Sequence, residues 1–336
     1  MRKKNNLLVF GILVIVVIVL VSIFVFNQTS NNEVSFRLKW FINPSYTGEL
    51  VASDLGFYEE QGLNLSINPG GPDLNSVKLV ASGADLIGST SLEEVILARE
   101  KGVPIVAIGA QYKDNPSCWI SLSDSGITQF EQFEGKTISV VYGDNTEVLY
   151  KAIINKLGLD RSKITEEPFR FVYTPFLEKQ VDVMPVYLND QAITIKNQGY
   201  SINTICAKDY GFNPYGNVYI TTEETIKNHP EVLVDFLKGS IKGWEYVRKN
   251  KENSTKILLE NMGDSLEYNS ALESVEVTLD LMNLDSENIF VMDKKRFEET
   301  QDLLLSFGNL EKEVDLDKSF TNQFVNQALD ELKMEN

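Results

Sequence analysis

Four aromatic side chains and one carboxylate stand close to predicted turns of the chain: Trp40, Tyr46, Tyr112, Tyr187 and Asp190. An aromatic ring can stack on a flat heterocycle, which contributes about 0.5–1.5 kcal/mol beyond the burial of area. A carboxylate can accept a hydrogen bond from an exocyclic amine, which contributes about 1.5–3 kcal/mol. This combination predicts a site for a planar molecule that is neutral or carries an amine. The alternative role is core packing for the rings and helix capping for the carboxylate.

Small polar residues follow the same turns and complete the set of candidate contacts: Asn43, Ser45, Ser89, Thr90, Gly143, Asn145 and Asn189. Their amides and hydroxyls can donate or accept hydrogen bonds. Gly143 permits a tight turn, and the helix predicted to follow it offers unpaired N–H groups. For Ser89 and Thr90 the alternative is capping of the next helix. We therefore predict a ligand-binding surface made of rings, small polar groups and one carboxylate.

The chain lacks the residues on which most catalytic sites depend. Its only histidine, His229, precedes Pro230 at a predicted helix start, where a surface or capping role is expected. No GxSxG, GxGxxG or GxxxxGK[ST] motif occurs, and the two cysteines belong to no Cys/His cluster. We therefore predict no catalytic residue, no metal site and no cofactor.

The composition is that of an acidic chain of moderate size. It has 336 residues, of which 43% are hydrophobic, and this is enough for one or two well-buried domains. The net charge of −17 argues against partners such as nucleic acid or anionic lipid. Cys118 and Cys206 are expected to be free, partly buried thiols. A disulfide remains open if the compartment is oxidising.

The N-terminal segment has the pattern of a membrane anchor. Three basic residues at positions 2–4 precede an uncharged apolar run over residues 7–26, which is long enough to cross a bilayer. Cleaved signal peptides usually have a shorter run followed by small residues. We therefore expect residues 1–33 to be an uncleaved signal-anchor with a polar tether, and the rest of the chain to lie outside the cell. Cleavage within the run is the alternative.

From residue 34 the chain alternates strand-like and helix-like segments, which is typical of an α/β fold. The first strand is predicted over residues 36–40, and its alternation would point Lys39 away from Trp40. Further strands are predicted over residues 63–68, 86–89, 105–108, 137–141, 169–173, 202–207 and 218–221. Ligands bind beyond the carboxyl ends of parallel strands, so the turn over residues 40–47 is expected at the site.

Several of these segments resemble one family of proteins. The opening carries Trp40, Thr47-Gly48, Val51-Ala52, Gly56-Phe57-Tyr58 and Gly62-Leu63, and residues 68–88 read NPGGPDLNSVKLVASGADLIG. Residues 175–190 resemble the pattern PFL.G.VDA…Y..NE, with Lys179 in place of Gly and Asp190 in place of Glu. These motifs are similar to those of solute-binding proteins of the NMT1/thiamine-pyrimidine type. Their relatives bind riboflavin, sulfonates, taurine or nitrate.

The resemblance implies a two-lobed, periplasmic-binding-protein-like fold of type II. Lobe 1 would comprise residues 34–121 and 217–336, and lobe 2 residues 122–216, with crossings near 119–123 and 214–219. Such a protein is expected to be a monomer that takes up a small solute between its lobes and docks on an ABC permease. The implied solute is a planar heterocycle such as a thiamine pyrimidine precursor.

Other functions stay open beside this one. Riboflavin is another flat solute, whereas sulfonate, taurine or nitrate would need several converging cations, which the predicted turns offer only sparsely. A ligand-sensing ectodomain would use the same kind of cleft. A pyrimidine synthase of this fold carries a cysteine cluster and an active-site histidine. Residues 184–189 contain no cysteine, and the first part of lobe 1, residues 34–121, contains no histidine.

Overall fold

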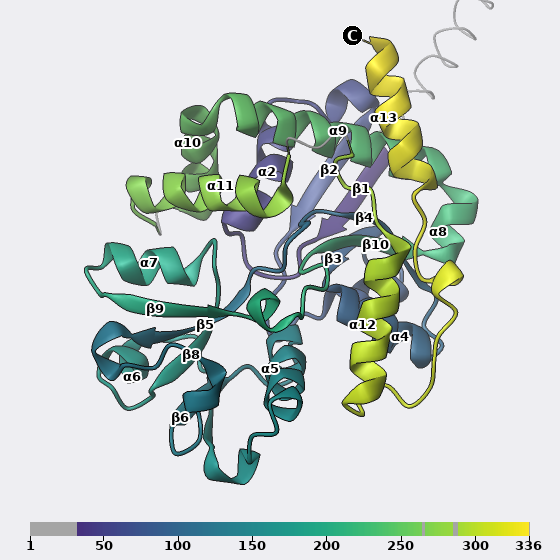
Figure 1. Cartoon of the computed structure of the whole chain (residues 1–336). Coiled ribbons are helices and arrows are strands. Elements are labelled where there is room, and N and C mark those ends of the chain that lie inside the picture. Colours follow the sequence, from purple (N-terminus) through teal and green to yellow (C-terminus); the bar gives the residue numbers. More distant parts are fainter. Residues whose placement is uncertain (1–31, 264–265, 285–287, 336) are drawn as a thin grey trace, which may run out of the picture.

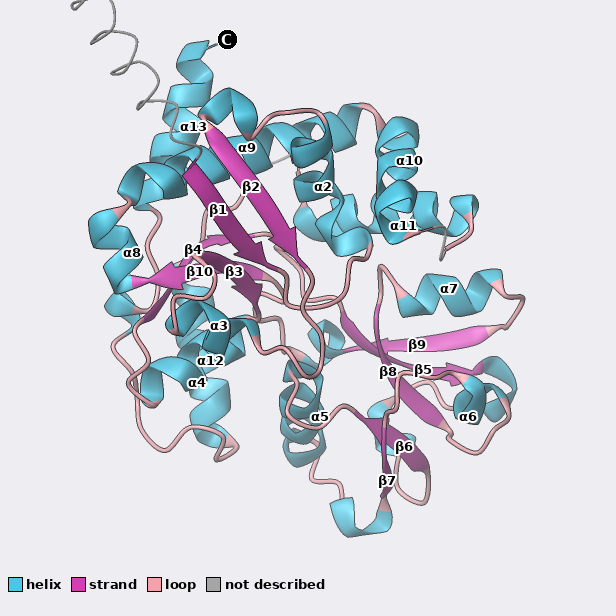
Figure 2. Ribbon diagram, turned by 180° about the vertical axis from the view of Figure 1, so that it is seen from behind, coloured by secondary structure: helices cyan, strands magenta, loops and turns pink. Residues whose placement is uncertain are grey.

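The computed structural model describes residues 32–263, 266–284 and 288–335 of the chain (Figure 1). These residues form two five-stranded sheets, and helices pack against both (Figure 2). The predicted signal-anchor and nearly all of its tether lie outside the described residues. Within the described part of the chain, no helix combines the length and the apolar character needed to span a membrane.

The first sheet has the strand order β2-β1-β3-β10-β4. Its strands are β1 (Asn32–Arg37), β2 (Leu63–Asn68), β3 (Ile87–Thr90), β4 (Ile105–Ala110) and β10 (Val218–Thr222). β1 runs parallel to β2 and β3, whereas β10 is antiparallel to β3 and β4. Every residue of β3 and β4 is buried, as expected for short apolar strands in a sheet that helices cover.

Helices from both halves of the sequence cover this sheet. They are α2 (Thr47–Asp54), α3 (Ser76–Ala81), α4 (Leu92–Glu100), α8 (Glu223–Asn228), α9 (Pro230–Lys249), α10 (Lys251–Met262), α11 (Tyr268–Met282), α12 (Lys294–Ser306) and α13 (Gln323–Glu335). α2 packs closely on α9, because a Cβ at Gly48 would lie 2.3 Å from the ring of Trp244. This contact holds the loop that precedes α2 against the sheet.

The second sheet has the order β7-β6-β8-β5-β9. Its strands are β5 (Ser117–Leu122), β6 (Thr137–Val140), β7 (Thr165–Pro168), β8 (Val183–Tyr187) and β9 (Ile202–Cys206). Its helices are α5 (Asn145–Lys156), α6 (Thr174–Leu177) and α7 (Gln191–Asn197). α7 lies beside α11 of the first group, so the two halves touch along these helices (Figures 1 and 2).

Two segments connect the sheets, over residues 111–116 and 211–217, and they run side by side. The backbone N–H of Gln111 donates to the carbonyl of Asn217 (3.0 Å), and Asn115 Nδ2 donates to the carbonyl of Pro214 (2.8 Å). The prediction of a first crossing near residues 119–123 is wrong. Those residues belong to or follow β5, which pairs with β8 on one edge and β9 on the other.

Three further expectations are corrected by the structure. β1 ends at Arg37, so Lys39 and Trp40 lie in a loop and not in a strand. Residues 169–173 form the loop after β7. Cys118 and Cys206 are not free thiols, because they form a disulfide between paired residues of β5 and β9.

Candidate ligand-binding site

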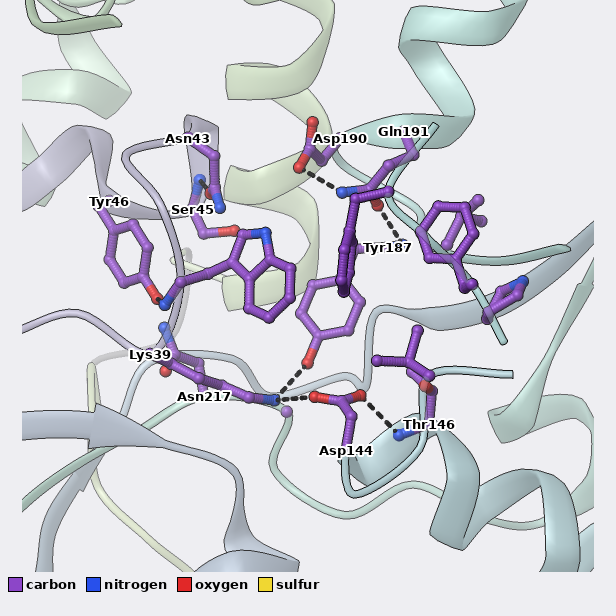
Figure 3. A pocket seen from close by; sticks show the side chains of 17 residues that line it. Lys39, Asn43, Ser45, Tyr46, Asp144, Thr146, Tyr187, Asp190, Gln191 and Asn217 are labelled. Carbon is purple, nitrogen blue, oxygen red and sulfur yellow. Dashed lines mark hydrogen bonds and ion pairs between the residues drawn. The ribbon is translucent and has the colours of Figure 1, made fainter. Parts of the chain in front are cut away.

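A cavity lies between the two sheets, beyond the carboxyl ends of β1 and β8 (Figure 3). The loop between β1 and α2 forms one wall with Lys39, Trp40, Asn43, Ser45 and Tyr46. The opposite wall comes from the second sheet and includes Asp144, Thr146, Phe169, Phe171, Tyr187, Asp190 and Gln191. Gly216 and Asn217 of the second connecting segment close one side. The cavity is therefore shared by both halves of the protein.

The loop after β1 has a fixed shape because its polar groups bond to one another. Asn43 Oδ1 accepts a hydrogen bond from the backbone N–H of Ser45 (2.8 Å), and Pro44 begins a short helical turn that leads into α2. The buried Tyr46 accepts a hydrogen bond from the backbone N–H of Trp40 (3.3 Å). The turn thus holds the indole of Trp40 at the cavity.

Trp40 meets an aromatic ring from the other half of the molecule. Its indole is half-buried, and its ring centroid lies 5.1 Å from that of Phe171, with 54° between the ring planes. Phe171 is 39% exposed and has a φ of 58°, a backbone conformation that phenylalanine rarely adopts. Tyr187 lines the same cavity. The rings can therefore contact a flat molecule from more than one side.

Lys39 points into the cavity, contrary to the prediction that it turns away from Trp40. Strand alternation does not apply to it, because β1 ends two residues earlier. Its Nζ donates to Asn145 Oδ1 (2.6 Å) and to Tyr187 Oη (3.0 Å). Burial would lower the pKa of Lys39, but attraction to Asp144, whose Oδ2 lies 3.6 Å away, and the bond to Tyr187 outweigh it. The pKa therefore lies well above its usual value, and the side chain is an ammonium with three partners.

Asp190 supplies a carboxylate to the same space. Burial raises its pKa to about 6, so it is mostly ionised at neutral pH. Its Oδ2 accepts a hydrogen bond from Gln191 Nε2 (2.7 Å), while Gln191 Oε1 accepts from the backbone N–H of Tyr187 (2.8 Å). Gln191 thereby links the carboxylate to the end of β8.

The structure brings six of the predicted site residues together at this cavity: Trp40, Asn43, Ser45, Tyr46, Tyr187 and Asp190. Asn145 lies behind the wall as a partner of Lys39. Ser89 is buried and accepts from the backbone N–H of Lys39 (2.9 Å). These positions support the wall from behind.

The remaining predicted residues make structural contacts. Thr90 donates to the carboxylate of Glu94 at the start of α4. Asn189 is buried, and its Nδ2 lies 3.2 Å from Tyr112 Oη and 2.8 Å from Thr278 Oγ1 of α11. Tyr112 is fully buried. Asn189 therefore joins the second sheet to the helices of the first.

Sequence reasoning missed eleven residues that line the cavity, and seven of them carry polar or aromatic side chains: Lys39, Asp144, Thr146, Phe169, Phe171, Gln191 and Asn217. Asp144 could have been predicted, because it lies between the predicted residues Gly143 and Asn145 at the start of α5. Phe169 and Phe171 are part of a predicted strand, and the structure places them in a loop instead. For Asn217 the sequence gives no local signal.

Two α/β halves with a cavity between them define the fold of the periplasmic binding proteins. The solved structure of the alkanesulfonate-binding protein SsuA from Xanthomonas axonopodis pv. citri, bound to MOPS, has this fold. It matches with a TM-score of 0.66 and 14% identity, covering 86% of this chain and 98% of that one. The predicted two-lobed fold is confirmed at this level.

The chain belongs to the family described as NMT1/THI5 like, whose model matches residues 43–254. It is 25% identical to the formylaminopyrimidine-binding protein of Halalkalibacterium halodurans, over 88% of this chain and 93% of that protein. It is 22% identical to the riboflavin-binding protein RibY of Chloroflexus aurantiacus, over 89% and 87%. A 4-amino-5-hydroxymethyl-2-methylpyrimidine phosphate synthase of Legionella pneumophila is 22% identical over 68% and 73%.

Proposed function

We propose that this protein is the extracytoplasmic solute-binding protein of an ABC importer, and that its solute is a planar nitrogen heterocycle such as a thiamine pyrimidine precursor. The observation that carries the proposal is the lining of the cavity. Rings from both halves meet there, Asp190 offers an acceptor, and Lys39 is the one cation among the lining residues. A flat molecule with hydrogen-bond donors fits these groups.

An anionic solute suits this lining less well. The oxygens of a sulfonate or nitrate only accept hydrogen bonds, so they need donors. The ammonium of Lys39 already bonds to Asn145 and Tyr187 and lies near Asp144. Asp190 would repel a bound anion at neutral pH. Riboflavin is flat and remains the second candidate, because one relative is a riboflavin-binding protein.

We infer that the protein is not an enzyme, although some relatives are synthases. The cavity lining contains neither histidine nor cysteine. His229 is exposed and immediately precedes α9. Both cysteines are held in the disulfide of the second sheet.

The proposal also covers the placement of the protein in the cell. The apolar run over residues 7–26 would anchor it, with the binding lobes outside the cytoplasm. A disulfide persists in oxidising compartments, and this supports a location of the binding lobes outside the cytoplasm. The lobes would meet at the two connecting segments, and the monomer would close on its solute before docking on the permease.

The melting temperature of the full chain in detergent tests the proposal. Probes are 4-amino-5-hydroxymethyl-2-methylpyrimidine, riboflavin and ethanesulfonate. A ligand that binds only the folded state raises the melting temperature, by an amount that grows with concentration. We expect a rise with at least one ring compound and none with ethanesulfonate. The opposite result would favour a sulfonate-type binder, and stimulation of ATP hydrolysis by a reconstituted permease would distinguish transport from sensing.

A further inference from the structure

Asn217, one of the residues that line the cavity, carries a buried hydrogen-bond acceptor without a partner in the described part of the chain. The residue lies just before β10 and lines the cavity (Figure 3), and it is 3% exposed. Its Oδ1 has no hydrogen-bond partner among the described residues. A buried polar group without a partner is uncommon, and at a cavity wall it points to a missing ligand atom.

The orientation of this amide follows from its neighbours. The backbone carbonyl of Ser45 can only accept, so the side chain of Gln111 must present its NH2 group there. Gln111 Oε1 then faces Asn217, which must donate through its own NH2 group. The one orientation that satisfies both bonds leaves Asn217 Oδ1 as the unpaired atom. Reversing the amide of Asn217 would set two oxygens against each other.

The neighbouring groups complete the pattern. Asp190, on the opposite wall, is a second acceptor, while Gln191 already uses both ends of its amide. Thr146 is 5% exposed and lines the cavity, and its hydroxyl has no partner among the described residues. The groups with which these walls can meet a solute therefore include two acceptors and one hydroxyl.

We propose that Asn217 is a specificity-determining residue whose Oδ1 accepts a hydrogen bond from the solute. The solute class is then a flat ring with N–H or O–H donors at two edges, one for Asn217 and one for Asp190. This inference rests on the proposed function and narrows it. A solute whose polar atoms only accept leaves both groups unpaired, and removal of one donor should weaken binding by about 10- to 100-fold.

Binding of isosteric probes to the full chain tests this assignment. In 4-amino-5-hydroxymethyl-2-methylpyrimidine, the amine is replaced by methyl in one analogue, and the hydroxymethyl group by ethyl in another. Riboflavin and N3-methylriboflavin form a second pair. Affinities are measured by calorimetry for the wild type, Asn217→Ala and Asn203→Ala. Asn203 is the control, because it is a partly buried asparagine of β9 that bonds to Ser121 and Ile127 and does not line the cavity.

We expect the wild type to prefer each parent compound that binds, by at least about 10-fold over a masked analogue. Asn217→Ala should abolish the preference for one donor and keep the preference for the other, whereas Asn203→Ala should keep both. If the alanine variant does not fold, Asn217→Ser replaces it, since its hydroxyl can still donate to Gln111 while it brings no carbonyl to the cavity.

Two kinds of result would overturn the assignment. The first is that Asn217→Ala leaves every ratio unchanged and lowers all affinities by the same factor, which is the signature of a purely structural residue. Equal affinity of the wild type for parent and masked compounds would contradict it as well. Either result leaves the proposed function standing. If only the flavins bind, the pyrimidine is the wrong solute, and the flavin pair then tests Asn217. If ethanesulfonate is the only probe that raises the melting temperature, both the proposed function and the role of Asn217 are wrong.

Discussion

At the scale of single residues, Trp40 and Trp244 lie in different environments, one at the cavity and one in the core. Its indole is half-buried and contacts Phe171 across the cavity. Trp244, by comparison, is fully buried against α2 and donates through Nε1 to Glu49 (3.2 Å). If the proposed function holds, substitution of Trp40 should affect binding, whereas substitution of Trp244 should affect folding.

Replacement of Trp40 by alanine should lower affinity for the solute by about 10-fold, because a stack and its buried area are lost. The melting temperature should change little. Trp244→Ala is the contrasting variant and should lose about 3–5 kcal/mol of stability. Calorimetry and thermal melting measure the two effects. Unchanged affinity together with a large loss of stability in Trp40→Ala would assign the indole to the core.

Asp190→Asn should weaken binding but stabilise the folded protein at neutral pH. Because burial raises the pKa of Asp190 from 3.8 to about 6, ionisation is unfavourable in the folded state. The wild type then carries this cost in full above about pH 6, and the cost shrinks as the pH falls and disappears below about pH 3, where both states are protonated. We expect Asp190→Asn to gain about 1–2 kcal/mol at pH 7 and nothing at about pH 3.

Urea unfolding of both proteins across this pH range measures the effect. A stability difference that is constant with pH, or that favours the wild type at pH 7, would show that ionisation of Asp190 does not destabilise the folded protein. The same samples report the loss of affinity, since a variant without the carboxylate lacks the charged acceptor.

At the scale of elements, the disulfide joins β5 to β9 at residues paired in the sheet. It closes a loop across 88 residues, which contains β6, β7 and β8. Reduction should therefore destabilise the second sheet, typically by about 2–4 kcal/mol. Urea unfolding with and without reductant measures this, and the double variant Cys118→Ser/Cys206→Ser should not respond to reductant. Identical unfolding of the oxidised and reduced wild type would contradict a stabilising bridge.

The succession of elements was largely predictable from the sequence. β2 begins and ends where its alternation predicted, and β3, β4, β6, β9 and β10 lie within one or two residues of their predicted bounds. These strand bounds are predictable because each is marked by an apolar run with Pro or Gly close beside it in the sequence. The crossing near residues 119–123 was misplaced, because a short strand and an extended connection have the same local pattern.

The site was predicted only where its residues share one turn. Trp40, Asn43, Ser45 and Tyr46 were found because they follow one strand. The predicted orientation of Lys39 is wrong, because strand alternation does not extend past the end of β1 at Arg37. The acceptor at Asn217 depends on Gln111, which lies 106 residues earlier in the chain. Such an arrangement arises from tertiary contacts, which a single sequence does not display.

At the scale of the whole molecule, polar bonds join the two halves around the cavity. Lys39 reaches Asn145, Asn189 reaches Thr278, and Asn197 Nδ2 donates to Ser270 Oγ (2.9 Å). Water can replace such bonds when the halves separate, whereas a large apolar interface would resist opening. These polar contacts are what the proposed opening and closing of the halves at the connecting segments requires.

Gly216 tests the role of these segments. A Cβ at this position would lie 2.4 Å from Pro116 Cδ, so alanine cannot fit without pushing the two connections apart. Gly216→Ala should lose about 1–3 kcal/mol of stability and bind more weakly, because Gly216 and Asn217 line the cavity. Pro116→Ala in the same chain removes the obstructing ring and should restore much of both. If Gly216→Ala melts at the same temperature as the wild type, close packing of the two connecting segments is not required for stability.

The identity of the molecule that copurifies with the protein tests the central claim most directly. The protein is isolated without added ligand from cells grown in rich medium, and the bound molecule is released and identified by mass spectrometry. The account predicts a flat nitrogen heterocycle with hydrogen-bond donors at two edges. A sulfonate, nitrate or another solute with only acceptor atoms would contradict it.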